Sequence, residues 1–526
     1  VEDLRVLAAA TLYPESPNHY PAHTLVNETV KAASNLPKIA HAKGMINAVL
    51  RRLIEHPQDF DILLNRHQNH YPQWWTYKLQ KAYPKEWQKI LKTNLFPAKL
   101  FVRVNPKVFT REEYVEELRK VHMSALEIPT EILKLAPQAV CLEQSMPISK
   151  LPHFSSGGVC VQDLGAQMAG HLLSPKDGED VLDACAAPGG KSTLLANWFK
   201  DGLVVANETI KGRNAILVEN ITKWGADNMI VTQNDPGHFK ALPAFFDLVL
   251  IDAPCSGSGL FRKDISAISE WSLDNVQHCS LRQQRIIEES LDTLKEGGYL
   301  IYSTCSYSAE EDEKIMDQIA NLPGMVNIKI SVPASWNIIS CESPEQQCQG
   351  FRFYPDKIKG EGFFISVFKK EGAVQNTSTS DSFKFTPLSK NELSVAKSFF
   401  ELPATHQYLS HQNSMIAIPN LFEPAILSIL SNLYVKKLGL DLGAVKGKDF
   451  IPSHTLAMSY WSNLPYQTLE VGAETALNYL RRAEVQLDGN VGWHLIKYQS
   501  IALGWAKLLP NRANNYYPNE WRILNY

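Results

Sequence analysis

Five short apolar runs between residues 180 and 305 each end in an acidic residue or a cysteine, and this pattern constrains the fold most. The runs are Asp180–Asp183, Leu203–Glu208, Met229–Asp235, Phe246–Cys255 and Gly297–Cys305. Strands that alternate with helical segments are typical of a doubly wound α/β sheet. Ligands of such sheets bind outside the carboxyl ends of the strands, near the point where the strand order reverses. We therefore expect all five run ends to face one crevice.

The loop after the first run, DACAAPGGKST at Asp183–Thr193, ends like a nucleotide-binding P-loop. A P-loop requires a glycine at position 185, where this chain has Cys185. ATP binding is therefore not expected. The segment instead predicts a strand, a small-residue turn over 184–190 that lets the backbone approach a ligand, and a helix over Ser192–Phe199.

Acidic residues end the second and third runs. Glu208 lies where a dinucleotide-type fold places a carboxylate on ribose hydroxyls, and Asp235 could accept a hydrogen bond from an adenine amino group. A ligand with ribose, adenine and a cationic centre suits these carboxylates better than ATP does, because it brings no phosphate charge. S-adenosylmethionine meets this description. The plain alternative is that both acids cap strand ends in an ordinary sheet.

Two of the eight cysteines differ from the others in where they lie. A free cysteine is most often a small buried hydrophobe, but Cys255 and Cys305 each end a run that leads into the expected crevice. A thiolate beside a methyl donor suits methylation of a pyrimidine at carbon 5, because thiolate addition to carbon 6 makes carbon 5 nucleophilic. Spacing alone does not decide which cysteine attacks. Asp252 is placed to hold or protonate ring nitrogen N3.

Three basic residues are candidates to assist this chemistry. Lys191, or Arg262 and Lys263, could lower a thiolate pKa or contact an RNA phosphate backbone. No pair of cysteines has the CxxC spacing of a zinc site, so no metal is expected.

The segments DACAAPGGK, DAPCSGSG with RKD after it, STCS and GEGFF (Gly360–Phe364) resemble the signature motifs of the Sun/Fmu family of RNA cytosine-5 methyltransferases. The resemblance implies a Rossmann-like class I methyltransferase core with S-adenosylmethionine as cofactor. It implies that Cys305 is the nucleophile and that Cys255 helps to release the product. The implied cofactor-binding residues are Cys185, Ala186, Ala187, Pro188, Gly189, Gly190, Lys191, Glu208, Asp235 and Asp252.

Both flanks also resemble parts of this family. PAHTLVNETVKAAS and KGMINAVLRRL, within residues 21–53, have apolar positions at helical spacing and resemble the RNA-binding domain related to NusB. VKGKDFIPSHTLAMS and LGWAKLLPNRANNYYPNEWRI are similar to the PUA-like RNA-binding extension of another branch. The predicted regions are a NusB-like helical region, an α+β lead-in, the methyltransferase domain, a Ser/Thr-rich linker and a PUA-like mixed α/β domain: 1–58, 59–155, 156–372, 373–388 and 389–526.

Charge and hydropathy add little about partners. The net charge of −3 over 526 residues leaves any RNA contact to local basic patches, and no apolar run approaches the about 18 residues of a membrane span. A cytoplasmic, monomeric protein without membrane contact is expected. We expect it to methylate carbon 5 of a cytosine in RNA, with 16S ribosomal RNA or the small subunit as substrate. The alternatives are the same chemistry on tRNA, and a non-catalytic RNA-binding factor in ribosome assembly.

Overall fold

The computed structural model describes residues 21–37, 39–56, 71–94, 96, 98–144, 146–170, 178–264, 266–372, 385, 388–447, 449–459 and 467–524. Residues 1–20, the predicted boundary near residue 58 and most of the predicted linker 373–388 lie outside the described residues. The contacts divide the chain into two units: residues 1–98 with 261–265, and residues 99–260 with 266–526. The five predicted regions remain predictions of the sequence.

The first unit is helical in its described part. Its elements are α2 (Ala22–Asn35), η1 (Ala40–Ala42), α3 (Lys43–Glu55), α5 (Gln73–Ala82) and α6 (Trp87–Asn94). Val26 and Ala33 of α2 pack with Ile46 and Leu50 of α3, at the helical spacing that predicted both helices. The resemblance of this region to NusB remains a prediction.

The second unit begins with a small antiparallel sheet. Its strand order is β2-β3-β1-β4, and its helices are α7 and α8. The bounds are β1 (Phe101–Val104), α7 (Arg111–Lys120), β2 (Ala125–Leu126), α8 (Thr130–Leu133), β3 (Ala139–Leu142), η2 (Ile148–Lys150) and β4 (Val159–Val161). Thr110 and Glu113 form a capping box that begins α7.

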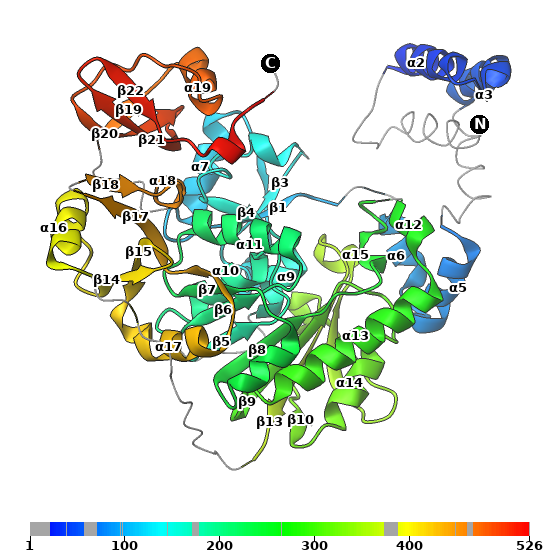
Figure 1. The fold of residues 1–526 in the computed structure, drawn as a ribbon. Helices are drawn as coiled ribbons and strands as arrows, with labels where there is room; N and C mark the ends of the chain where they lie inside the picture. Colours follow the sequence, from blue (N-terminus) through cyan, green and yellow to red (C-terminus); the bar gives the residue numbers. More distant parts are fainter. Residues whose placement is uncertain are drawn as a thin grey trace. The chain divides into compact units, whose positions relative to one another are not determined.

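The central sheet has five parallel strands in the order β9-β8-β5-β6-β7, which confirms the predicted doubly wound fold (Figure 1). These strands are β5 (Val181–Asp183), β6 (Val204–Asn207), β7 (Met229–Thr232), β8 (Phe246–Asp252) and β9 (Leu294–Thr304). The chain runs outward from β5 to β7 and then returns to β8 on the other side of β5. The strand order therefore reverses between β5 and β8, where such folds bind ligands.

Successive residues of these strands face opposite layers of helices. Leu248 and Leu250 of β8 join the cluster that contains residues of α10 and α11, whereas Val249 and Ile251 join the cluster that contains residues of α13 and α14. A side-chain period of two with both faces covered is what a parallel sheet requires. The helices and turns of this domain are α9 (Leu164–Ala169), α10 (Gly190–Trp198), α11 (Lys211–Trp224), η4 (Pro236–Ala241), η5 (Ser258–Leu260), α12 (Ser266–Glu270), α13 (Leu273–Leu291), α14 (Glu313–Ala320), η6 (Ala334–Trp336) and α15 (Pro355–Ile358).

Antiparallel strands extend the central sheet on both sides. Beside β9 lie β13 (Phe363–Lys370), then β12 (Gln349–Phe353) and β11 (Ile339–Glu342), while β10 (Met325–Asn327) also pairs with β13. On the far side, β16 (Val435–Leu438) pairs with β7. Ile418, Ile429 and Leu433 of the same C-terminal region are buried in the cluster that contains α13 and α14. Residues 416–438 therefore share the core of the central domain.

The rest of the C-terminal region forms two four-stranded sheets, β14-β15-β17-β18 and β19-β20-β21-β22. Their elements are α16 (Lys390–Phe399), β14 (His406–His411), β15 (Ser414–Pro419), η7 (Asn420–Phe422), α17 (Glu423–Asn432), β17 (Leu440–Lys446), β18 (Asp449–Pro452), α18 (His454–Met458), β19 (Thr468–Glu470), α19 (Ala473–Leu480), β20 (Gly492–Tyr498), β21 (Ile501–Leu509), β22 (Arg512–Asn515) and η9 (Asn519–Trp521). In the part of the chain that the structure describes, no helix combines the length and apolar character that crossing a bilayer needs.

Ile429→Ala should lower the free energy of unfolding of the central domain by about 2–5 kcal/mol, because it leaves a cavity in the shared core. Ile429 is fully buried, whereas Leu421 is 63% exposed and supplies the matched control Leu421→Ala. Urea denaturation followed by tryptophan fluorescence measures both variants. A separate C-terminal transition that shifts while the main transition stays unchanged would contradict the shared core.

Candidate functional site

The two cysteines predicted to act in chemistry lie side by side. Cys305 directly follows β9, and Cys255 follows β8 by three residues. The two strands are parallel neighbours with Asp252 opposite Ser303, so both cysteines emerge at the same edge of the sheet. Their Sγ atoms are 3.3 Å apart, and both side chains are partly buried. One small ring could therefore contact both thiols.

A glycine permits this close approach. A Cβ atom added to Gly259 in η5 would lie 2.1 Å from the Cys305 carbonyl oxygen, much closer than two such atoms can approach. The loop after Cys255 therefore packs directly on the backbone of Cys305 only because residue 259 lacks a side chain.

An ion pair borders the thiols. The Lys191 Nζ atom donates to Asp252 Oδ2 at 2.6 Å, and the Ser303 hydroxyl donates to Asp252 Oδ1 at 2.9 Å. The ammonium group also lies 5.1 Å from the ring centre of Phe363, which belongs to the GEGFF motif. Burial alone would lower the pKa of Lys191, but the negative charges of Asp252 and Asp183 and the Cys305 thiolate together raise it. Lys191 is therefore a fixed positive charge beside Cys305.

The two thiols differ in acidity. The hydrogen bond from Cys255 lowers the pKa of Cys305 below its ordinary value against the opposing effect of burial, and the Lys191 charge adds to this lowering. The hydrogen bond to Cys305, burial and the nearby charges of Cys305 and Glu311 raise the pKa of Cys255. The Lys191 charge beside Cys305 therefore favours a thiolate at Cys305 over one at Cys255, and the thiolate is the nucleophilic form of cysteine.

The small-residue turn lies between β5 and α10, as predicted. Gly189 has φ +109°, a left-handed conformation that favours glycine, and α10 begins at Gly190. Arg213 of α11 donates to the Ala187 carbonyl at 2.8 Å, and Asn220 donates to the Pro188 carbonyl at 2.8 Å. The turn therefore has a defined shape that α11 supports.

Two further residues of this segment are at least half-buried. Burial raises the pKa of the Cys185 thiol, so this cysteine is a poor candidate for a nucleophile. Ala186 is also buried and belongs to the cluster on the α10 and α11 side of the sheet. Both residues therefore pack against the protein interior and help to fix the shape of the turn.

The two predicted nucleoside-binding carboxylates have different surroundings. Glu208 directly follows β6, is 4% exposed, accepts from the Ile210 backbone N–H at 2.9 Å and lies 3.3 Å from Arg213. Asp235 lies three residues beyond the end of β7, caps η4 and forms a 2.6 Å ion pair with Arg285 of α13. Both carboxylates are held in place by neighbours from other elements.

Arg262 and Lys263 belong to the first unit of the chain, although the residues on either side of 261–265 belong to the second. Residues 261–264 contact the helices of the first unit, where Arg262 donates to the Phe96 carbonyl at 2.7 Å and the Phe261 ring centre lies 4.8 Å from that of Trp75. Of the three predicted cations, Lys191 is the one that the structure places beside a thiol. A role for Arg262 and Lys263 in RNA binding remains a prediction.

Three polar residues near the site were given no role of their own in the sequence analysis, although Asp183 was recognised as a run end. Asp183 ends β5 and is fully buried, and burial raises its pKa to about 7 although it accepts a 2.6 Å hydrogen bond from Ser192. Ser303 supports Asp252, and Arg213 supports both Glu208 and the turn. Asp183 and Ser303 lie at strand ends, a signal that could have identified them, whereas Arg213 lies within a helix and gives no such signal.

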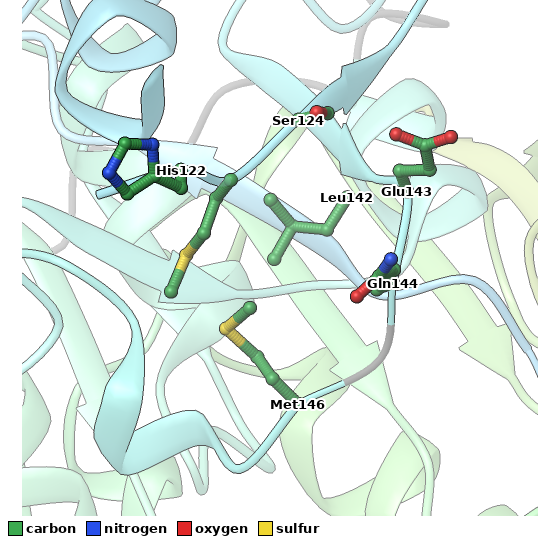
Figure 2. A pocket seen from close by; sticks show the side chains of 7 residues that line it. His122, Ser124, Leu142, Glu143, Gln144 and Met146 are labelled. Carbon is green, nitrogen blue, oxygen red and sulfur yellow. The ribbon is translucent and has the colours of Figure 1, made fainter. Parts of the chain in front are cut away.

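A hollow in the small antiparallel sheet involves none of the predicted site residues (Figure 2). It is lined by His122, Met123, Ser124, Leu142, Glu143, Gln144 and Met146. These lining residues include no cysteine, so the two-thiol chemistry predicted from the sequence has no basis in this hollow.

The residues at the switch between β5 and β8 fit S-adenosylmethionine. The acceptors in this region are the carboxylates of Glu208 and Asp252, which suit ribose hydroxyls and a positively charged sulfur. The turn at 184–190 adds backbone groups at the start of α10. Because S-adenosylmethionine has no phosphate groups, it does not need the glycine pattern of a P-loop.

Comparisons with known proteins identify the family. The family described as "16S rRNA methyltransferase RsmB/F" matches residues 170–369, "Methyltr_RsmF/B-like, ferredoxin-like domain" matches 71–149, and "Methyltransferase RsmF PUA domain" matches 466–523. The ferredoxin-like match includes β1, β2 and β3 of the small antiparallel sheet, and the PUA match includes β19–β22.

Relatives and solved structures agree with these matches. "Ribosomal RNA small subunit methyltransferase B" of Photorhabdus laumondii is 31% identical over 70% of this chain and 82% of the relative. "Ribosomal RNA small subunit methyltransferase F" of Aeromonas salmonicida is 28% identical over 72% of this chain and 82% of the relative. The structure described as "Crystal Structure of PH0851" shares the fold, with a TM-score of 0.54 at 22% identity over 69% of this chain and 80% of that one. With these family matches and a 31% identical relative covered over most of its length, the chain belongs to the RsmB/F family of 16S rRNA methyltransferases.

Proposed function

We propose that the protein methylates carbon 5 of a cytosine in small-subunit ribosomal RNA through a covalent adduct between Cys305 and carbon 6 of the base. The observation that carries this proposal is the pair of thiols 3.3 Å apart beside the Lys191–Asp252 ion pair. The names of the relatives support small-subunit rRNA rather than tRNA as the substrate. The paired thiols argue against a purely non-catalytic assembly factor.

The cofactor of this methyltransferase family is S-adenosylmethionine, which supplies an electrophilic methyl group on a positively charged sulfur. Within the proposal, Glu208 and Asp235 hold the nucleoside part, and the turn from Cys185 to Gly190 lies against it. The Lys191–Asp252 ion pair lies between the nucleoside-binding residues and the two thiols in this proposal.

The proposed steps use the difference in acidity between the two cysteines. The Cys305 thiolate adds to carbon 6, and the displaced electron pair makes carbon 5 nucleophilic enough to accept the methyl group. Asp252 in its protonated form donates its proton to N3 as the thiolate adds, and the carboxylate that results accepts a hydrogen bond from N3–H until the ring returns the proton. Cys255, which contacts the same sulfur, loses its own proton to solvent and then accepts the carbon-5 proton, and the electron pair of that C–H bond expels the Cys305 thiolate.

The RNA-binding part of the proposal rests on the flanking modules. The target base must leave its stack to reach the thiols, at a cost of a few kcal/mol. Contacts of the PUA domain with the RNA backbone would offset this cost. Bisulfite mapping of small-subunit rRNA from cells with and without the protein tests the modified base, and an unchanged cytosine pattern would exclude the proposed reaction.

Cys305→Ala should lower methyl transfer by roughly 10³-fold or more, because the nucleophile takes part in every turnover. Calorimetric binding of S-adenosylmethionine should stay near that of the unchanged protein. Cys279→Ala is the matched control, since Cys279 is a buried cysteine in the middle of α13. Transfer of a labelled methyl group to rRNA measures both variants, and retained activity in Cys305→Ala would refute the assignment.

Cys255→Ala should accumulate a covalent protein–RNA adduct, because Cys305 can still add to the base while release slows. The adduct appears as a slowly migrating band on a denaturing gel. The double variant with Cys305→Ala should show no such band. Equal adduct in both variants would contradict the division of roles.

Alkylation by iodoacetamide should modify Cys305 at lower pH than Cys255. A thiolate forms as the pH rises through the pKa, so the lowered pKa of Cys305 moves its labelling midpoint below about pH 8.5, the midpoint of a free thiol. The raised pKa of Cys255 moves its midpoint above that value. Peptide mass spectrometry over a pH series separates the two, and the reverse order would show that the acidities are assigned wrongly.

A further inference from the structure

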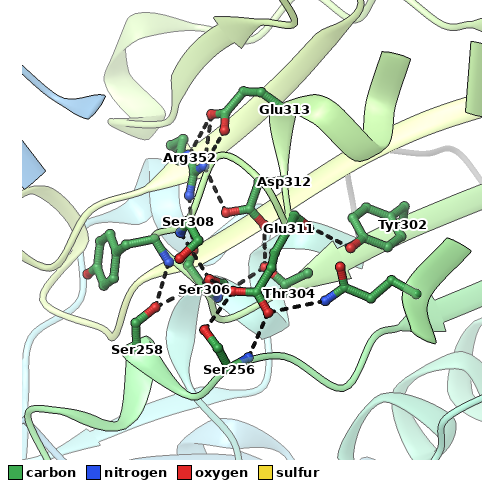
Figure 3. Close-up of polar contacts among 12 residues, drawn as sticks. Ser256, Ser258, Tyr302, Thr304, Ser306, Ser308, Glu311, Asp312, Glu313 and Arg352 are labelled. Carbon is green, nitrogen blue, oxygen red and sulfur yellow. Dashed lines mark hydrogen bonds and ion pairs between the residues drawn. The ribbon is translucent and has the colours of Figure 1, made fainter. Parts of the chain in front are cut away.

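One buried carboxylate contacts both loops that carry the cysteines (Figure 3). Each cysteine is followed by a serine, Ser256 after Cys255 and Ser306 after Cys305. Glu311 Oε1 accepts from the Ser256 backbone N–H at 2.7 Å, and Glu311 Oε2 accepts from the Ser256 hydroxyl and the Ser306 hydroxyl, each at 2.6 Å. A single rigid group therefore joins the residues that follow the two thiols.

Glu311 is itself firmly held. The residue is fully buried, Gln283 of α13 donates to Oε1 at 3.5 Å, and its backbone carbonyl accepts from the Tyr302 hydroxyl at 2.6 Å. Trp271 Nε1 donates to the Ser256 hydroxyl at 3.2 Å. A buried carboxylate is costly unless donors surround it, so loss of this arrangement would leave a charge without compensation.

The neighbouring acids have a different connection. Arg352 pairs with Asp312 at 2.8 Å and with Glu313 at 2.8 Å, and it donates to the Ser306 carbonyl at 3.0 Å. Asp312 accepts from the Thr304 hydroxyl at 2.5 Å. These contacts hold the Cys305 loop, whereas Glu311 also reaches the Cys255 loop.

We propose that Glu311 is a positioning residue that sets the separation of the Cys255 and Cys305 thiols by binding Ser256 and Ser306 together. The inference rests on the proposed function only in its consequence for catalysis, since the separation of the thiols is a property of the free protein. In the two-thiol reaction, a misplacement of about 1 Å can cost about 10²-fold in rate. Glu311 does not touch the base and acts through the two loops.

The test is Glu311→Gln, which keeps the size of the side chain but replaces one acceptor oxygen with an NH₂ donor. Phenylarsine oxide is the probe, because its arsenic bridges two thiols that lie close together. The affinity of the full-length variant for this probe should fall about tenfold or more. In methylation of rRNA, the fraction of protein trapped as covalent adduct should rise, because Cys255 no longer lies against the sulfur that must leave.

Asp317→Asn is the matched control. Asp317 is a 4% exposed carboxylate of α14 that accepts from the Glu345 and Gln346 backbone N–H groups, so it holds a different loop. This variant should bind phenylarsine oxide within about twofold of the unchanged protein, whatever its stability. An effect as large as that of Glu311→Gln would show that loss of any buried carboxylate disturbs the thiols and would overturn the proposal.

Ser306→Ala gives a second, milder variant if Glu311→Gln does not fold. It removes one hydroxyl of the same link and should weaken arsenical binding in the same direction. The losses of arsenical affinity caused by Glu311→Gln and Ser306→Ala should not add in the double variant, since both substitutions break the same Glu311–Ser306 contact. Unchanged arsenical binding in a folded Glu311→Gln or Ser306→Ala variant would refute the positioning role. A third outcome separates the two proposals. If the variants lose arsenical binding but the unchanged protein methylates no cytosine, the proposed function is refuted and the positioning role stands.

Discussion

The parallel pairing of β8 with β9 is the constraint on which the site depends. Adjacent parallel strands end at one edge of the sheet, so residues that follow them are brought within a few ångströms although 50 positions separate Cys255 from Cys305. The helices on both faces bury the strands, and in such sheets ligands bind at the carboxyl ends of the strands. The thiol pair, the ion pair and the turn before α10 all lie at strand ends for this reason.

Charge at this edge is dominated by carboxylates. Asp183, Asp252 and Glu208 end or follow neighbouring strands, and each would destabilise a thiolate nearby. Lys191 offsets this effect for Cys305 because it lies in the first turn of α10 and pairs with Asp252. The same surroundings suit a cationic methyl donor better than a nucleotide triphosphate, so one electrostatic arrangement serves both proposed partners of the reaction.

Residues outside the central domain also support the site. Arg103 of β1 is fully buried, donates to the Gly190 carbonyl at 3.0 Å and to the Thr193 hydroxyl at 2.6 Å, and so connects the small sheet to the start of α10. At the other side, β16 covers the edge of β7 and Asn234 bonds to Tyr434 in both directions. The small antiparallel sheet and the C-terminal region are therefore connected to the central domain through buried contacts and hydrogen bonds.

The sequence by itself determined the doubly wound sheet, its five parallel strands and the elements that carry the candidate residues, because strand periodicity and strand-end residues are local signals. It also indicated a cationic, nucleoside-containing cofactor, since Glu208 and Asp235 come at or shortly after the ends of two successive strands. Only the tertiary structure decided that Arg213 and Arg103 support the turn, that β16 completes the sheet, and that Glu311 bridges the cysteine loops. These contacts join residues far apart in the chain, and no local pattern encodes a partner that packing alone brings near.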